Sequence, residues 1–267
     1  MSRDALQGKV VVVVGGTTGL GLSGVYACLA AGAAVVAVGP PDSGAKGLDR
    51  ELGKRARLVR GDARDPATAR AAIRSALEDF GGFHALYHVA GGSGRSFGDG
   101  PLHEISDAGW DETLRLNLSS VFHSCRAAAD QFLAQGTPGS VLNMGSVLST
   151  SPSPRFFATH AYAAAKAGIE GLSLSAAAYY APRGIRFNVV RPGLTETPMS
   201  RRAFDDADIR GFIRAKQPLD GGRFGRPADL DSAVVFFLSD ASRFVTGQIL
   251  AVDGGWSVTD GGSGAGA

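Results

Sequence analysis

The feature that most limits the fold is an unbroken run of five valines, residues 10–14, that ends at Gly15-Gly16. β-Branched side chains favour extended backbone, and a run without polar alternation suits a strand that is buried on both faces of a sheet. A helix-compatible stretch follows at residues 20–31. A strand, a glycine turn and a helix in this order predict the first unit of an α/β fold.

The same alternation continues along the chain. We expect further strands at 33–38, 57–61, 85–90, 140–144, 185–190 and 249–252, and further helices at 66–80, 106–135, 161–181 and 227–238. Helical crossovers between parallel strands are right-handed and cover both faces of the sheet. The sequence therefore predicts an α/β, Rossmann-type doubly wound fold with a mainly seven-stranded parallel sheet. It predicts one domain over residues 1–258 and a flexible glycine-rich tail over 259–267.

Charge, hydropathy and cysteine usage exclude several classes of protein. The 27 basic and 25 acidic residues nearly cancel, which does not indicate nucleic-acid binding. No stretch reaches the roughly 18 apolar residues of a membrane span, and the first residues do not resemble a secretory signal. Cys28 and Cys125 have no metal-cluster spacing, so we expect reduced thiols and no metal. A cytoplasmic protein that binds neither nucleic acid nor membrane is expected.

The loop GGTTGLG, residues 15–21, joins the first strand to the first helix. Glycines allow a phosphate to approach the backbone, and the free N–H groups of a helix N-terminus face it. The position of the loop favours a nucleotide site over a plain turn. Contacts are expected from Gly15, Thr17, Thr18, Gly19 and Leu20.

With Val14 in place of a threonine, this loop resembles the TGxxxGxG loop of the short-chain dehydrogenase/reductase family. Residues 162–166, YAAAK, match the YxxxK motif of that family, and the likeness extends from Gly8 to about Val258. The resemblance implies a single dinucleotide-binding domain. It also implies an NAD(P)-dependent oxidoreductase that transfers a hydride between the nicotinamide and a secondary alcohol or ketone.

Tyr162 and Lys166 share one face of a helix, so the ammonium group can lie near the phenol. Together with an oxidised nicotinamide, that charge would lower the pKa of the phenol. The resemblance makes Tyr162 the acid or base, and Lys166 the group that lowers its pKa and holds the nicotinamide ribose. It makes Asn117 part of a proton relay through water.

Two serines compete for the role of hydrogen-bonding the substrate oxygen. The family spacing of thirteen residues before the tyrosine selects Ser149, whereas the end of the predicted strand 140–144 selects Ser146. We predict Ser146, because sheet pairing fixes a strand end. The loop 149–159, which contains two prolines, can absorb an insertion, and Ser149 is then a loop hydroxyl.

The resemblance places further cofactor contacts at other strand ends. These are Asp62 and Ala63 near the adenine, Val89, Ala90 and Gly91 in place of the NNAG motif, and Pro192, Gly193, Thr195 and Thr197 in a PGxxxT turn. Asp62 either contacts the adenine or, as a turn aspartate, caps the following helix. His88 replaces a family asparagine, and we expect a core imidazole bonded to a neighbouring strand end rather than a base.

The end of the second strand bears on the choice between NAD and NADP. Gly39 offers no carboxylate to the ribose hydroxyls of NAD, whereas Lys46 or Arg50 would pair with the 2′-phosphate of NADP. Asp42 would repel that phosphate. The sequence favours NADP, with NAD as the alternative.

The segment before Tyr162 contains Arg155-Phe156-Phe157 and His160. It predicts either an aromatic pocket wall with Arg155 as a carboxylate anchor, or a surface loop with a solvated arginine. A small, free, apolar or aromatic substrate is expected, because residues 129–131 and 176–179 lack the basic side chains by which similar reductases bind acyl carrier protein. A 3-oxoacyl-thioester reductase is one alternative function. A non-catalytic NAD(P) sensor is another, which the intact Tyr162 and Lys166 disfavour.

Assembly is suggested by helix 161–181, which carries few charges and many apolar residues, among them Ala161, Ala165, Leu172 and Tyr179. One sheet face needs less apolar surface than this. The family resemblance implies a homotetramer that uses this helix.

Overall fold

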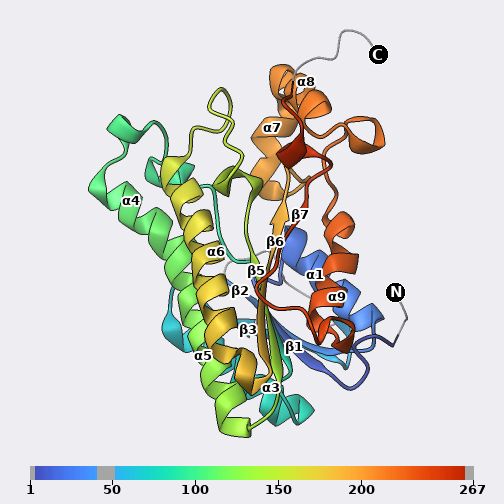
Figure 1. Cartoon of the computed structure of the whole chain (residues 1–267). Coiled ribbons are helices and arrows are strands. Elements are labelled where there is room, and N and C mark those ends of the chain that lie inside the picture. Colours follow the sequence, from blue (N-terminus) through green and yellow to red (C-terminus); the bar gives the residue numbers. More distant parts are fainter. Residues whose placement is uncertain (1–3, 41–51, 262–267) are drawn as a thin grey trace.

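The computed structural model describes residues 4–40 and 52–261. In this part of the chain seven strands form one parallel sheet in the order β3-β2-β1-β4-β5-β6-β7 (Figure 1). Their bounds are β1 Val10–Val14, β2 Ala34–Gly39, β3 Ala56–Arg60, β4 Ala85–His88, β5 Gly139–Met144, β6 Ile185–Pro192 and β7 Ile249–Val252. The strand order reverses between β1 and β4, which places a ligand crevice at their carboxyl ends. The predicted doubly wound α/β fold is confirmed.

Helices cover both faces of the sheet. Helices α1 (Gly19–Ala30) and α9 (Asp231–Leu238) pack on one face. Helices α3 (Pro66–Phe80), α5 (Ser120–Gln135) and α6 (His160–Tyr180) pack on the other. Figure 1 shows α7 (Arg201–Asp205) and α8 (Ala207–Lys216) together at one end of the molecule, beyond the sheet. No helix within the described ranges has the length and apolarity that crossing a bilayer requires.

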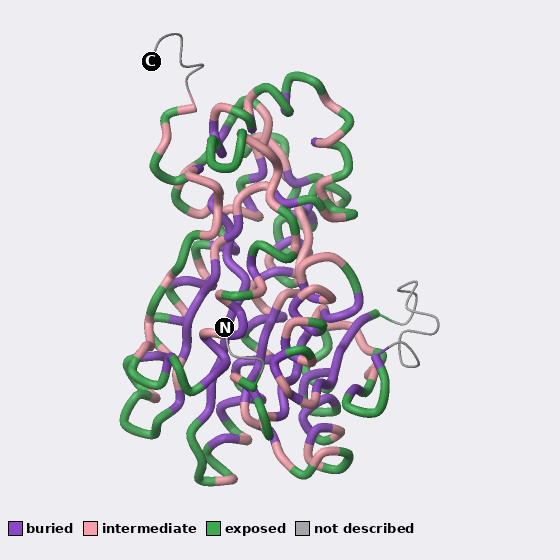
Figure 2. Tube along the Cα trace, turned by 90° about the vertical axis from the view of Figure 1, so that its right-hand side faces the viewer, coloured by how far each residue is buried: buried purple, intermediate pink, exposed green. Residues whose placement is uncertain are grey.

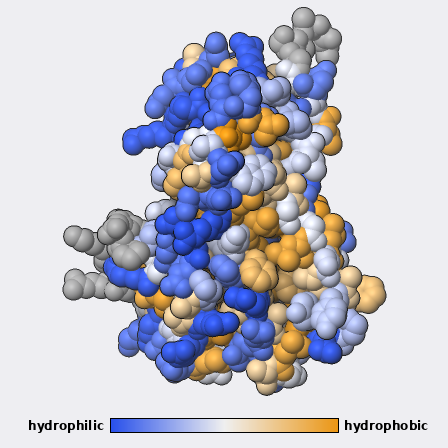
Figure 3. Space-filling view, turned by 90° about the vertical axis from the view of Figure 1, so that its left-hand side faces the viewer, coloured by the Kyte–Doolittle hydropathy of each residue, from blue (hydrophilic) through white to orange (hydrophobic). Residues whose placement is uncertain are grey.

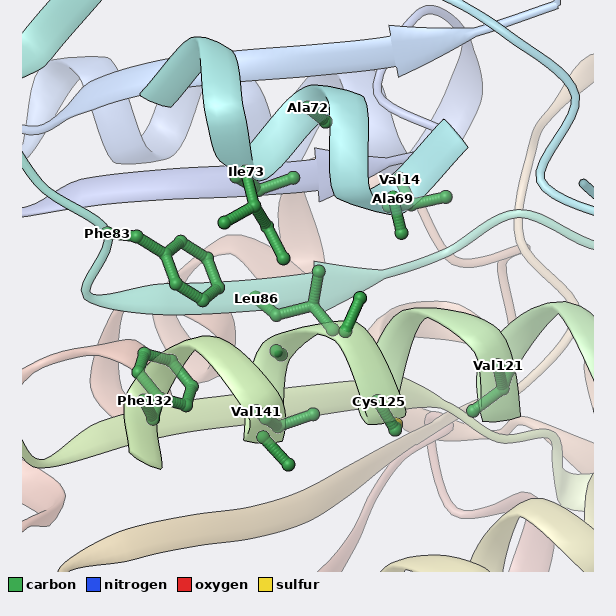
Figure 4. Packing of buried hydrophobic residues seen from close by; sticks show 14 of the residues in the cluster. Val14, Ala69, Ala72, Ile73, Phe83, Leu86, Val121, Cys125, Phe132 and Val141 are labelled. Atoms are coloured by element: carbon green, nitrogen blue, oxygen red, sulfur yellow. The ribbon is translucent and has the colours of Figure 1, made fainter. Parts of the chain in front are cut away.

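The valine run of β1 explains the two-layered core. Val11 and Val13 face α1 and α9, whereas Val10, Val12 and Val14 face α3 and α5. Figure 2 shows that buried chain runs through the centre of the molecule, and the strand residues of β1 are all buried. Figure 4 shows the apolar cluster on the α3 and α5 face of the sheet, in which Phe83 and Phe132 stack with ring centroids 4.6 Å apart. A strand with helices on both sides has no solvent face, so polar alternation is absent from its sequence.

The helix expected at 106–135 is divided in two. Helix α4 (Asp107–Leu114) is followed by a π-helical segment, Arg115–Ser119, before α5 begins. The Asn117 side-chain amide donates to the carbonyl oxygen of Thr113, four residues earlier, over 3.0 Å. That carbonyl is the normal acceptor of an α-helical N–H at position 117, so its capture favours a wider turn.

Helices α7 and α8 were not predicted from the sequence. Helix α8 nevertheless carries a recognisable start, because the Asp206 carboxylate accepts a hydrogen bond from the backbone N–H of Ile209 over 3.0 Å. Ile209 and Ile213 bury one face of this short helix against Trp256. The two helices contribute to a separate small apolar cluster. The hydrophobic pattern of each helix is too short to be recognised in the sequence.

One expectation about the surface of α6 needs correction. Ala161 and Ala165 of α6 are fully buried within the chain, because this side of the helix packs on the rest of the domain. Leu174 and Tyr179 of α6 are exposed. The glycine-rich tail expected at 259–267 starts with an anchored residue, since the Thr259 hydroxyl donates to the carbonyl oxygen of Lys216 over 2.9 Å. Residues 262–267 lie outside the described part of the chain.

Candidate active site

A cavity of about 620 Å³ opens at the carboxyl ends of the strands. It is lined by all of the residues that the sequence analysis assigned to the cofactor: Gly15, Thr17, Thr18, Gly19, Leu20, Asp62, Ala63, Val89, Ala90, Gly91, Tyr162, Lys166, Pro192, Gly193, Thr195 and Thr197. Ser146 lines the same cavity, whereas Asn117 and Ser149 are not among its lining residues. Residues taken from separate strand ends thus meet at one place.

The glycine loop after β1 leaves backbone donors open to this cavity. Gly15 has φ +88°, and a Cβ there would lie 2.5 Å from the backbone nitrogen of Ala90, so no side chain fits. The N-cap residue of α1, Thr18, makes no side-chain capping hydrogen bond. By contrast, Asp65 caps α3 and Ser106 caps α4. The first N–H groups of α1 therefore remain available to an anionic group such as a pyrophosphate.

Tyr162, Lys166 and Ser146 converge beside the end of β5. The Lys166 ammonium nitrogen lies 5.6 Å from the ring centroid of Tyr162 and donates to the carbonyl oxygen of Met144 over 2.8 Å. Burial raises the pKa of Tyr162, and a hydrogen bond with the Ser146 side chain opposes this rise. The phenol is therefore protonated at neutral pH and can act as a proton donor.

The ammonium group of Lys166 is itself buried, which lowers the pKa of this lysine to about 8. The two causes that shift the pKa of Tyr162 are burial of the phenol, which raises it, and the Ser146 hydrogen bond, which lowers it. The sequence analysis expected the lysine and an oxidised nicotinamide to lower this pKa together.

The two candidate serines have different surroundings. Ser146 is 6% exposed, lines the cavity and accepts a hydrogen bond from the N–H of Leu148 over 3.2 Å. The Ser149 hydroxyl lies 2.6 Å from Glu170 Oε1 and 2.7 Å from the carbonyl oxygen of Ser146. Glu170 is in turn paired with Arg191, with Nη2 and Oε2 2.7 Å apart. Ser149 thus belongs to a polar network behind the strand end, and Ser146 faces the cavity.

Asn117 holds the loop that follows β4. Its Oδ1 accepts from the N–H of Gly92 over 3.1 Å, and its Nδ2 donates to the carbonyl oxygen of Gly92 over 2.9 Å. A Cβ at Gly91 would lie 2.7 Å from Asn117 Oδ1. The asparagine side chain therefore fixes the cavity wall at Gly91-Gly92 and leaves little room for a side chain at Gly91.

Two open questions from the sequence concern Asp62 and His88. Asp65 caps α3, while the Asp62 carboxylate binds Arg64, with Nη2 and Oδ2 2.6 Å apart, and this guanidinium lowers the pKa of Asp62. His88 is fully buried, with Nδ1 2.9 Å from Ser124 Oγ. Burial lowers the pKa of His88 to about 3, so the ring is neutral. Its main partner lies on helix α5, and not on a neighbouring strand end as expected.

The end of β2, where the sequence analysis expected the adenosine ribose of the cofactor, lies partly within the described residues. A Cβ at Gly39 would overlap the Thr17 hydroxyl, so the end of β2 has no room for an acidic side chain unless Thr17 moves. Gly39 and Pro40 both line the cavity. Asp42, Lys46 and Arg50, which the sequence analysis weighed for cofactor choice, lie outside the described residues.

The opposite part of the cavity contains residues that sequence reasoning missed. Arg95, which follows β4, and Arg202, on α7, line the cavity together with Phe157 and Trp256. Arg155, the expected carboxylate anchor, does not line it. That guanidinium is exposed, with its central carbon 4.8 Å from the Phe156 ring centroid, so the surface alternative describes it correctly. No sequence pattern indicated a role for Arg202, because its helix α7 was not predicted.

Comparison with known proteins gives matches over nearly the whole chain. A family model described as enoyl-(acyl carrier protein) reductase matches residues 14–257. The cis-4-hydroxycyclohexanecarboxylate dehydrogenase of Sinomonas cyclohexanicum is 36% identical over 257 residues, covering 95% of this chain and 98% of that protein. The 3beta-hydroxysteroid dehydrogenase 1 of Eggerthella lenta is 36% identical over 262 residues, or 97% of each. The structure of a short-chain type dehydrogenase/reductase from Mycobacterium ulcerans has a TM-score of 0.86 at 28% identity, covering 95% of this chain and 91% of that chain.

Proposed function

Because the chain belongs to the short-chain dehydrogenase/reductase family, we propose that it is an NAD(P)-dependent oxidoreductase that interconverts a secondary alcohol and a ketone on a small ring compound. The observation that carries this proposal is the convergence of Tyr162, Lys166 and Ser146 at one cavity. The cavity also receives the uncapped N-terminus of α1, which suits a dinucleotide. A protein that only sensed the cofactor would need the glycine loop but not this trio.

The side chains divide the work of carbonyl reduction. When bound, the nicotinamide supplies the hydride for reduction and accepts it in oxidation. Ser146 donates a hydrogen bond to the substrate oxygen and positions it beside the Tyr162 hydroxyl. Tyr162 gives its proton to that oxygen as the alcohol forms, and takes it back in the reverse direction. Lys166, near the Tyr162 ring, stabilises the phenolate that remains.

Several features support a small ring substrate. Phe157 and Trp256, whose ring centroids are 6.0 Å apart, provide an aromatic wall of the cavity. Both relatives named above carry names of ring alcohols, a hydroxycyclohexanecarboxylate and a hydroxysteroid. The family model's description instead favours a thioester on acyl carrier protein. Residues 129–131 and 176–179, on α5 and α6, contain no lysine or arginine for such an acidic partner, which supports the free substrate.

For the cofactor we propose NADP. The support is the end of β2, where Gly39 has no carboxylate and where a side chain would fit only if Thr17 moved. A charge-assisted contact to a 2′-phosphate contributes about 1.5–3 kcal/mol, which corresponds to a preference of about tenfold or more. The test compares kcat/KM for NADPH and NADH with one ketone, and a tenfold advantage of NADH would contradict the proposal.

For assembly we propose a homotetramer in the cytoplasm. Its support is the apolar surface of α5 and α6, where Phe122, Leu133, Leu174 and Tyr179 are exposed. Figure 3 views the side of the molecule on which α4 and α5 lie in Figure 1, and hydrophobic side chains gather near its middle. The unpaired Cys28 and Cys125 fit a reducing compartment. Light scattering should give four times the mass of the chain, and a monomer at micromolar concentration would contradict this.

The experiment that tests the function is a set of initial-rate measurements with the purified chain. We expect loss of the reduced-nicotinamide absorbance with 4-methylcyclohexanone or 4-oxocyclohexanecarboxylate, and the matching alcohol as product. Acetoacetyl-coenzyme A serves as the thioester comparison. Turnover of the thioester alone would favour the reductase alternative. Cofactor binding without turnover of any of these ketones would favour the sensor.

A further inference from the structure

Two arginines from separate segments meet at the cavity wall near Tyr162. Arg95 lies in a 3-10 turn, Arg95–Phe97, after β4, and Arg202 lies on α7. Nη2 of Arg95 is 3.1 Å from the carbonyl oxygen of Phe156, and Nη2 of Arg202 is 3.3 Å from the same oxygen. Both side chains line the cavity. Two guanidinium groups thus share one neutral acceptor.

Within the described ranges, neither arginine forms an ion pair with an acidic side chain. The ion pairs found there include Arg64, Arg191 and Arg223, but neither Arg95 nor Arg202. Of the described residues that line the cavity, Asp62 is the one acid, and it is bound to Arg64 at the end of the edge strand β3.

Asp99 is the acid that acts on Arg95 electrostatically, but its carboxylate is engaged elsewhere. Its oxygens accept hydrogen bonds from the backbone N–H groups of Ala161 and Tyr162, over 3.0 and 2.9 Å, at the start of α6. Burial lowers the pKa of Arg95, and the charge of Arg202 adds to this lowering. The pair therefore leaves a net positive charge on the cavity wall, and an arriving anion would relieve the repulsion between the two groups.

The cavity that contains the pair is lined by apolar residues as well as by Ser93, Thr159 and Ser200. Leu148, Phe157, Met199 and Trp256 contribute side chains to the same cavity. A hydrocarbon ring suits these residues, while a carboxylate matches the fork geometry of a guanidinium group. Each arginine is exposed and donates one hydrogen bond to the Phe156 carbonyl oxygen, which leaves its other N–H groups available to a ligand.

We propose that Arg95 and Arg202 bind a carboxylate on the substrate, so that the preferred substrates are ring hydroxy acids and their oxo counterparts. The inference rests on the proposed function for the position of the reacting oxygen, at Tyr162 and Ser146. The ring lies against the apolar lining, with its alcohol or ketone at one end and its carboxylate at the other. Arg95 and Arg202 then determine specificity without taking part in proton transfer.

The kinetic test uses a matched pair of ketones, 4-oxocyclohexanecarboxylate and 4-methylcyclohexanone, with the wild type and the variants Arg95→Gln, Arg202→Gln and the double variant. We expect the wild type to prefer the carboxylate by about tenfold or more in kcat/KM, since one charge-assisted contact has about this effect. Each single variant should lose about tenfold on the carboxylate, mainly through KM, and less than about twofold on the neutral ketone.

Arg155→Gln is the matched control. It removes one positive charge beside the same Phe156 but outside the cavity lining, so both ketones should keep their wild-type kinetics. An equal loss in this variant would show a general effect of net charge and would overturn the specific assignment. An equal loss on both ketones in the double variant would show a structural role and would also overturn it.

A binding measurement separates this inference from the proposed function. Calorimetric titration of cyclohexanecarboxylate into the wild type with NADPH should show binding that weakens at least about tenfold in the double variant. If the chain reduces no ketone but binds this acid through both arginines, the proposed function fails and the anion site stands. If neutral and anionic ketones react equally well, the anion site fails and the proposed function stands. Preference for acetoacetyl-coenzyme A that is lost in the double variant would assign the pair to a phosphate and would overturn the carboxylate.

Discussion

Replacing Lys166 with methionine measures the cost of a buried ammonium group in the site. Burial lowers the pKa of Lys166 from 10.5 to about 8, a difference of about 2.5 units. At about 1.36 kcal/mol per unit, the charged lysine destabilises the folded chain by about 3 kcal/mol below pH 8. The variant loses the hydrogen bond to the carbonyl oxygen of Met144, which contributes about 1 kcal/mol. We therefore expect Lys166→Met to be more stable at pH 7 by about 2 kcal/mol, and inactive.

The sign of the pH dependence distinguishes this cause from better packing. Between pH 8 and 10.5 the unfolded lysine keeps its proton while the folded one loses it, so the unfolded state binds more protons. The stability of the wild type accordingly rises with pH across this window, and the full penalty is present below it. The advantage of the methionine variant should therefore disappear near pH 10.

Thermal unfolding of both proteins at pH 7 and pH 10 provides the assay. For a chain of this length, about 2 kcal/mol corresponds to a Tm increase of roughly 4–8 °C at pH 7. Lys54→Met, a change at an exposed lysine, is the matched control and should leave Tm almost unchanged. A methionine variant that is less stable at pH 7, or equally advantaged at both pH values, would refute the reasoning.

Two further predictions concern Ser146 and His88. Ser146→Ala should lower kcat by about two to three orders of magnitude, because it removes a donor to the substrate oxygen, whereas Ser149→Ala should change kcat only mildly. Steady-state rates decide this, and the reverse order would show that the thirteen-residue spacing was the better guide. For His88, the folded pKa of about 3 lies below the ordinary 6.5, so the wild type loses stability as pH falls through this window, by about 1.4 kcal/mol per unit. His88→Asn should therefore lose less in Tm between pH 7 and pH 5 than the wild type, and an identical loss would contradict the buried neutral ring.

The sequence predicted those features whose causes are local. Five valines need a strand with two covered faces, and the four-residue spacing of Tyr162 and Lys166 places both on one side of a helix. The position of Ser146 at the cavity followed from its place at a strand end. In these cases the structure is determined mainly by residues that are close together in the sequence.

Features that depend on contacts between distant segments were missed. Arg95 and Arg202 meet only because the loop after β4 and helix α7 both approach Phe156. Arg155 has the same residue type and a more suggestive position in the sequence, yet its side chain lies on the outer surface. The bond from the Asn117 side chain to Gly92, 25 positions away, likewise joins distant segments.

The central claim is that the Tyr162 hydroxyl gives the proton in carbonyl reduction, and Tyr162→Phe tests it most directly. The measurement is kcat with one ketone and saturating cofactor, together with the Kd of the reduced cofactor. We predict a fall in kcat of about a hundredfold or more, because one positioned general acid is removed, and a Kd within about twofold of the wild type. A variant that keeps more than about a tenth of the wild-type kcat would contradict the account.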